Sequence, residues 1–86
     1  MKFSVVWQPD AEAQLAELWE RSADRAALAS AANHIERVLR SYPERVGEDR
    51  FDDDRIMFEE LLGLVFRLIL EDRLVQVLRV WDITRR

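Results

Sequence analysis

Cysteine is absent from the sequence, which excludes disulfide bonds and thiolate metal sites. There is one histidine, His34, and there are only two glycines in 86 residues. A site built from several histidines and a glycine-rich phosphate loop are therefore both excluded. The run Asp52-Asp53-Asp54 lacks the spacing and the glycine turn of a calcium loop, so we interpret it as a solvated acidic tip. We expect neither a metal nor a cofactor.

Long hydrophobic runs are also missing. Gln8-Pro9-Asp10 interrupts the apolar start of the chain before a signal-peptide core of about 7–15 residues can form. No later segment approaches the roughly 20 apolar residues of a membrane span. We expect a single domain over residues 1–86, located in the cytoplasm and making no membrane contact.

Basic charge is carried almost entirely by arginine, with twelve arginines against the single lysine Lys2. The net charge is −4, and the acidic excess is concentrated in residues 41–62, which carry three basic and eight acidic groups. Residues 63–86 carry five basic and three acidic groups. The planar guanidinium group favours contact surfaces, although codon usage in a GC-rich genome would produce the same bias.

Hydrophobic periodicity predicts two helices after a short strand. Residues 2–8 alternate β-branched and aromatic side chains with others, as in a strand. Apolar residues at helical spacing then predict a helix over 9–22 and a second over 25–41. Asp24 is a suitable N-cap for the second helix, and Pro43 ends it.

The C-terminal half predicts a loop followed by three strands. Residues 43–54 are acidic and contain few apolar groups, which is typical of a surface loop. A short strand is expected over 55–59, followed by a hairpin of strands 63–70 and 74–81.

The hairpin register follows from polarity. With Leu70 opposite Leu74, one face holds Leu64, Phe66, Leu68, Leu70, Leu74, Gln76, Leu78 and Val80, and only Gln76 among them is polar. The other face then holds Val65, Arg67, Ile69, Val75, Val77, Arg79 and Trp81. A slip by one residue would place Arg79 among the leucines at a cost of several kcal/mol, so we expect the first register.

These elements give an α+β domain in the order β-α-α-β-β-β, with a helical hairpin packed on one face of a small antiparallel sheet. The face away from the helices combines apolar and arginine side chains, which indicates a binding surface. The expected partner-binding residues are Val65, Arg67, Ile69, Val77, Arg79 and Trp81. In the simpler alternative, the two arginines only form ion pairs with Glu71, Asp82 or the acidic loop.

Several short motifs, taken in order, resemble the RelE/ParE superfamily of bacterial type II toxins. They are Val5-Val6-Trp7, Pro9, the LAELW segment at 15–19, a helix ending at Pro43, the Gly47-Glu48-Asp49-Arg50 turn and EDRLVQVLRVW at 71–81. The resemblance covers nearly the whole chain and implies the compact α+β fold of that superfamily.

The resemblance implies two different activities. RelE-like members are ribosome-dependent mRNA endonucleases that use basic residues on the open sheet face, whereas ParE-like members lack this set and are associated with DNA gyrase. This sequence has RIMFE at 55–59, where the nucleases carry lysines, and Gly63 at or near the position of a nuclease arginine. Arg67, Arg79 and Arg85 remain as candidates for stabilising a phosphate, but arginine is a poor general base.

We therefore favour a ParE-like toxin subunit of a plasmid-stabilisation toxin–antitoxin system that acts by binding protein. Its expected partners are a cognate antitoxin and, as cellular target, DNA gyrase or the ribosome. Two alternatives remain open, an mRNA endoribonuclease of RelE type and a non-toxic interaction domain of the same fold. Self-association into a homodimer through the open face is a further alternative.

Overall fold

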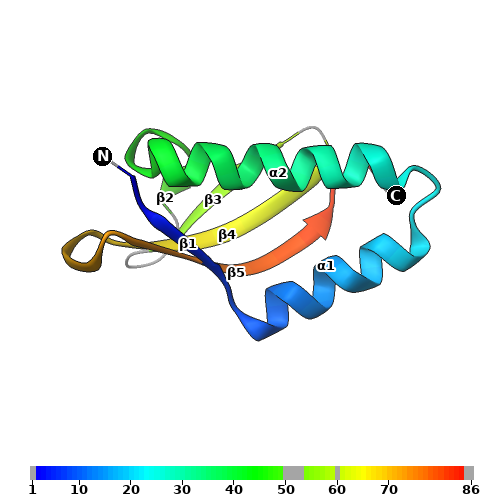
Figure 1. Cartoon of the computed structure of the whole chain (residues 1–86), viewed down its shortest axis with the longest axis horizontal. Helices are drawn as coiled ribbons and strands as arrows, with labels where there is room; N and C mark the ends of the chain where they lie inside the picture. Colours follow the sequence, from blue (N-terminus) through cyan, green and yellow to red (C-terminus); the bar gives the residue numbers. More distant parts are fainter. Residues whose placement is uncertain (1, 50–53, 60, 85–86) are drawn as a thin grey trace.

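The computed structural model describes residues 2–49, 54–59 and 61–84. These described residues form five strands, two helices and two short 3-10 turns (Figure 1). They are β1 (Ser4–Trp7), α1 (Pro9–Arg21), α2 (Arg25–Ser41), η1 (Pro43–Arg45), β2 (Glu48–Asp49), β3 (Asp54–Phe58), β4 (Leu62–Ile69), η2 (Leu70–Asp72) and β5 (Leu74–Asp82).

Both helices begin and end within one residue of the positions that the sequence predicts. Pro9 occupies the first turn of α1, where its missing N–H costs nothing. The N-cap of α2 is Asp24, whose Oδ1 accepts a hydrogen bond of 3.0 Å from the backbone N–H of Ala27. The helix ends at Ser41, two residues before Pro43.

Replacing Asp24 with alanine should lower the free energy of unfolding by about 0.5–2 kcal/mol, because the N–H of Ala27 loses its partner. Urea denaturation followed by circular dichroism measures this loss. Asp10→Ala is the matched control, because Asp10 lies in the first turn of α1 but is not its N-cap. The control should cost less, and its effect should vanish in high salt. An Asp24→Ala effect that also vanished in salt would contradict the capping role.

The sheet has the strand order β1-β5-β4-β3-β2. The expected α+β class, the helix-covered face and the order β-α-α-β-β-β are confirmed, with one addition. Residues 43–54, expected as a surface loop, contain the turn η1 and the two-residue strand β2, which pairs with β3 at the edge of the sheet. The sheet is mixed, however, and not wholly antiparallel as expected, because β1 pairs in parallel with β5, with Ser4 opposite Leu74 and Trp7 opposite Val77. Parallel neighbours need a long connection, and the two helices with the remaining strands supply it here.

The β4–β5 hairpin follows the predicted register over only half of its length. Val65 lies opposite Arg79 as expected, but Phe66 lies opposite Val77, so Leu78 has no partner and forms a β-bulge. The turn is correspondingly one residue longer than expected, with Ile69 opposite Leu74.

The bulge changes which residues of β5 face the helices. Without it, Gln76 would lie on the helix side, whereas in the structure it lies opposite Arg67. Val75 and Val77 move into the core instead, where both are fully buried. Burying a valine side chain is worth about 1.5–3 kcal/mol, but Leu74 and Leu78 lose the core positions that a continuous register would give them. The net gain of the bulge is that Gln76 leaves the helix-covered face.

The expected placement of Leu70, Leu74 and Leu78 on the helix-covered face is wrong. Leu70 is exposed in the turn η2, Leu74 lies opposite Ile69 on the other face, and Leu78 is the half-buried extra residue of the bulge.

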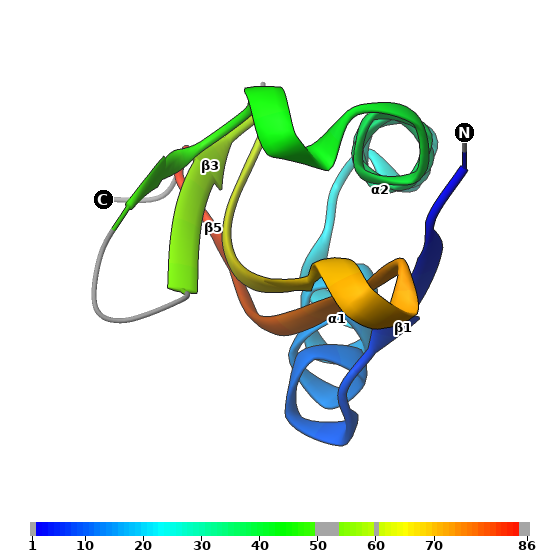
Figure 2. The same cartoon turned by 90° about the vertical axis from the view of Figure 1, so that its left-hand side faces the viewer.

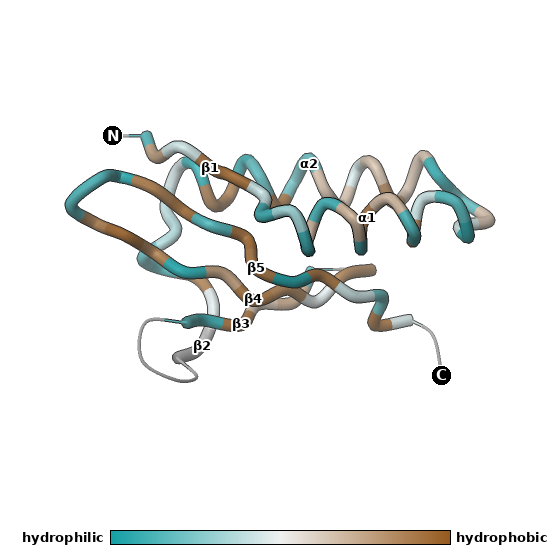
Figure 3. The backbone as a smooth tube through the Cα atoms, turned by 90° about the horizontal axis from the view of Figure 1, so that it is seen from below, coloured by the Kyte–Doolittle hydropathy of each residue, from teal (hydrophilic) through white to brown (hydrophobic). Residues whose placement is uncertain are grey.

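The core lies between the helix layer and the sheet (Figure 3). Seen from the end, the sheet is curved and α2 lies on its concave side (Figure 2). The largest fully buried side chains include Ile35 and Leu39 of α2 and Leu62, Leu64 and Phe66 of β4. The helix α1 extends the cover along β5, where the Gln14 side chain accepts a hydrogen bond of 2.8 Å from the N–H of Val80.

Candidate functional site

The face of the sheet directed away from the helices is called the open face here. Strand registers place on it alternate residues of β3, β4 and β5. They are Asp54, Ile56, Phe58, Gly63, Val65, Arg67, Ile69, Leu74, Gln76, Arg79 and Trp81. The structure therefore brings Arg67, Ile69, Arg79, Val65 and Trp81 of the predicted binding set to one face.

Val77 does not belong to this surface. The sequence placed it beside Arg67, but the bulge rotates it to the helix side, where it is 0% exposed. The same correction applies to Val75. Val65 lies on the open face between Ile56 and Arg79, yet it is only 7% exposed. Val65 therefore lies beneath the exposed side chains of this face and offers a binding partner little accessible surface area.

Arg67 is held by a carboxylate from the neighbouring strand. Its Nε donates to Asp54 Oδ1 at 2.8 Å, and the two residues lie directly opposite each other on β4 and β3. The alternative in which an arginine pairs with the acidic segment is therefore realised at Arg67. Asp54 offsets the charge of Arg67, which reduces the attraction that this guanidinium exerts on an external anion.

An aromatic pair occupies the other end of the open face. The rings of Phe58 and Trp81 meet edge to face with their centroids 6.3 Å apart. Gly63 lies between them in the ladder, opposite both Phe58 and Trp81. A Cβ at Gly63 would lie 2.7–2.8 Å from three atoms of the Trp81 indole, so the ring rests directly on this glycine.

Phe58 is a site residue that the sequence reasoning did not select. It is 60% exposed, an unusual position for a phenylalanine. The signal that could have identified it is the isolated Gly63 within a strand, since such a glycine often marks close approach of another group.

Replacing Gly63 with alanine should displace the Trp81 ring and lower the free energy of unfolding by about 1–3 kcal/mol. Near-ultraviolet circular dichroism and urea denaturation measure the two effects. In a Trp81→Leu background the same glycine change should cost much less, because the smaller side chain leaves room for the new methyl group. Equal costs in both backgrounds would contradict the packing of Trp81 on Gly63.

The remaining candidates are not gathered at one point. Arg79 is exposed on the open face beside Trp81, whereas Arg85 lies outside the described residues. His34 belongs to α2, and its Nε2 lies 3.0 Å from Glu59 Oε2. Among the described residues, no group of three or more histidines, cysteines or carboxylates could hold a metal ion. None of the helices in the described part of the chain is long and apolar enough to cross a membrane.

Three solved structures of toxin–antitoxin complexes share this architecture. The chain is similar to one in the RelBE2 complex of Mycobacterium tuberculosis, with 23% identity, a TM-score of 0.79 and coverage of 99% of this chain and 95% of that one. It is also similar to a chain in the chromosomal ParDE system of P. aeruginosa, with 15% identity, a TM-score of 0.71 and coverage of 94% of this chain and 96% of that one. A chain in the intact E. coli RelBE complex has 17% identity and a TM-score of 0.67, with 96% of this chain and 99% of that one covered. No family model and no curated protein matches the sequence. The chain therefore has the RelE/ParE-like toxin fold.

Proposed function

We propose that this chain is the toxin-like subunit of a type II toxin–antitoxin pair and that it acts in the manner of ParE, by binding protein. The observation that carries the proposal is the composition of the open face. It presents the Phe58–Trp81 pair next to the exposed Arg79. Aromatic and arginine side chains are the residue types most enriched at the energetic centres of protein interfaces.

The same face is poorly suited to cutting a phosphodiester bond. Cleavage needs charge stabilisation together with a proton acceptor and a proton donor. Arg67 is engaged by Asp54, and the indole of Trp81 covers Gly63, at or near the position where the resemblance places a nuclease arginine. His34, which could transfer protons, lies on α2 behind the sheet.

The partner that fits this face best is a cognate antitoxin segment with apolar and acidic side chains. The aromatic pair offers an apolar anchor, and Arg79 offers a charge that a carboxylate can pair with. Each of the three solved structures described above is of a toxin–antitoxin complex or system. DNA gyrase is the proposed cellular target, with the ribosome as the competing one.

Induced expression of the chain in a bacterial host tests the toxin proposal. Growth should stop, and incorporation of a DNA precursor should fall before incorporation of a labelled amino acid. Co-expression of the product of an adjacent short gene should restore growth. Continued growth at high expression without any partner would favour a non-toxic interaction domain. An earlier loss of translation would favour the ribosome as target.

The second candidate function is an mRNA endoribonuclease, and the exposed Arg79 on the open face is the observation that favours it. We predict that purified, partner-free protein does not cut mRNA in a translating extract, because the open face provides no group with an unperturbed pKa near neutrality. Primer extension on the extract's mRNA measures this. Codon-specific cuts that disappear in Arg79→Ala but persist in Arg45→Ala would make the enzyme the better assignment.

A further inference from the structure

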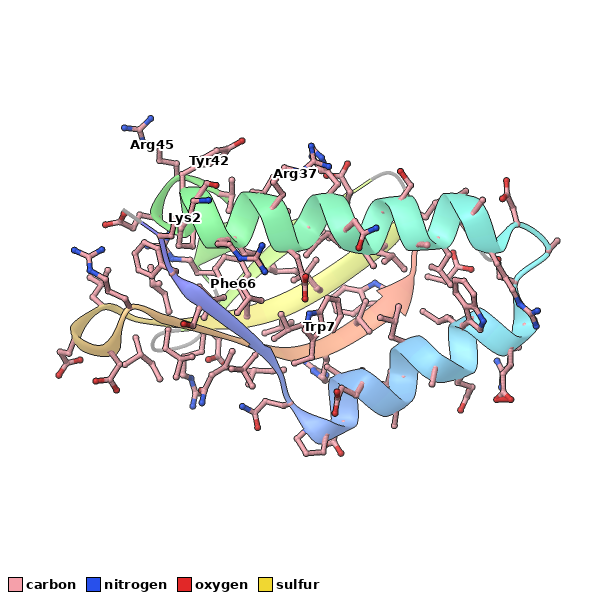
Figure 4. All side chains as sticks on the ribbon, in the orientation of Figure 1. Lys2, Trp7, Arg37, Tyr42, Arg45 and Phe66 are labelled. Carbon is pink, nitrogen blue, oxygen red and sulfur yellow. The ribbon has the colours of Figure 1, made fainter. Side chains whose placement is uncertain are left out.

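A groove separates α1 from α2 on the side of the molecule opposite the open face. It has a volume of about 510 Å³ and is lined by residues of β1 and both helices. They are Trp7, Glu12, Leu15, Ala16, Trp19, Ala32, Asn33 and Glu36. Trp7 lies between the two helices (Figure 4). The volume is within the range of about 300–1,000 Å³ that small-ligand sites occupy.

The groove is built by aromatic side chains and by small residues. Ala16 of α1 and Ala32 of α2 leave the space that larger side chains would fill. The Trp7 indole is held in place because its Nε1–H donates to Glu36 Oε1 at 2.9 Å. Trp19 contributes a second indole and is 42% exposed.

The charge of the groove has one sign. Of the described residues that line it, only Glu12 and Glu36 are charged. Glu36 is partly offset by Arg40, whose guanidinium nitrogen is 3.7 Å away. Trp19 already binds a cation, because the Arg25 guanidinium lies 5.7 Å from the centroid of its ring. This surface therefore combines carboxylates with indoles, the two groups that attract organic cations most strongly.

We propose that the groove binds an aliphatic polyamine, with ammonium groups at Glu12 and Glu36 and the alkyl chain against Trp7 and Trp19. A neutral apolar ligand would desolvate Glu12 without giving it a partner, and an anion would lie against the carboxylates of Glu12 and Glu36. A polyamine satisfies the carboxylates and covers the apolar floor at the same time. The proposal depends on residues other than those of the open face, so it is independent of the proposed toxin function.

Tryptophan fluorescence tests the site directly, because two of the three tryptophans line it. The Trp81→Phe variant, which retains only the groove indoles, is titrated with spermidine at low ionic strength. We expect a saturable change in emission. A neutral diol of matching length should produce none, because it lacks the charges. A linear response, or an equal response to the diol, would overturn the proposal.

Conservative variants locate the binding. Glu12→Gln and Glu36→Gln should each weaken spermidine binding by about threefold to fivefold, and glutamine at 36 retains an acceptor for Trp7. Glu20→Gln removes the same charge from α1 outside the groove lining and should leave the affinity unchanged. Equal weakening in all three variants would show that only net charge matters and would overturn the site. Saturable quenching by a basic helical peptide without any by spermidine would assign the groove to a protein partner instead.

Discussion

Replacing Phe66 with alanine is expected to lower the free energy of unfolding by about 3–5 kcal/mol. The ring is 0% exposed and is among the largest fully buried side chains. It also lies under Gly47, where an added Cβ would come within 3.1 Å of the ring. Because domains of this kind are stable by only about 5–15 kcal/mol, a large fraction of the variant is expected to unfold well below the melting temperature of the parent protein.

Phe58→Ala is the matched control for this experiment, since the same atoms are removed from a ring that is 60% exposed. Its cost should be about 1 kcal/mol, which corresponds to the loss of the edge-to-face contact with Trp81. Urea denaturation of both variants under identical conditions gives the comparison. Similar costs at the two positions would mean that β4 does not form the centre of the core.

Local sequence signals were sufficient to predict the helices. Pro9, Asp24 and Pro43 determine where α1 begins and where α2 begins and ends, and each acts through its own backbone or its nearest neighbours. The apolar stripe of α2 that the sequence indicates is the buried face in the structure, including Leu28, Ile35 and Leu39. Such signals need no knowledge of the rest of the fold.

The features that the sequence did not predict depend on pairing between distant segments. The parallel pairing of β1 with β5 joins the two ends of the chain, and no local pattern specifies it. The bulge at Leu78 is a compromise between two demands, because Arg79 must face outward while Val75 and Val77 gain from burial. A register chosen by polarity alone satisfies the first demand and places Gln76 in the core.

The candidate site was predictable only in part, because the positions of its residues also depend on the strand registers. Arg79 and Trp81 lie where an alternating strand places them, on the correct side of the bulge. Val77 lies beyond the bulge, so its assignment to the open face was wrong. The ion pair between Arg67 and Asp54 and the contact between Phe58 and Trp81 required the register of β3 against β4, for which the sequence carried no argument.

The Arg67–Asp54 pair also determines which arginine can test the proposed interface. Arg67→Glu would place a carboxylate directly opposite Asp54, and like charges opposite each other destabilise a sheet. Any loss of binding in that variant would be confounded by a loss of stability. Arg79 lies opposite the apolar Val65, so its charge can be reversed without creating such a pair.

We therefore expect Trp81→Ala to weaken binding of the cognate partner by about 30-fold and Arg79→Glu by about tenfold. Trp81 supplies the apolar anchor of the open face, and Arg79 supplies a charge complementary to an acidic segment. The partner co-purified from co-expression of the adjacent gene is titrated against each variant by isothermal calorimetry. Circular dichroism first establishes that each variant is folded at the temperature used.

Trp19→Ala and Arg45→Glu are the controls, because they make the same chemical changes at exposed positions on α1 and η1, away from the open face. Both should bind the partner with nearly unchanged affinity. Loss of binding in Trp19→Ala with full binding in Trp81→Ala would place the interface on the helical side of the molecule. If all four variants bound equally, neither surface would be the docking site. The affinity of Trp81→Ala thus decides whether the aromatic pair on the open face is an interface or only local packing.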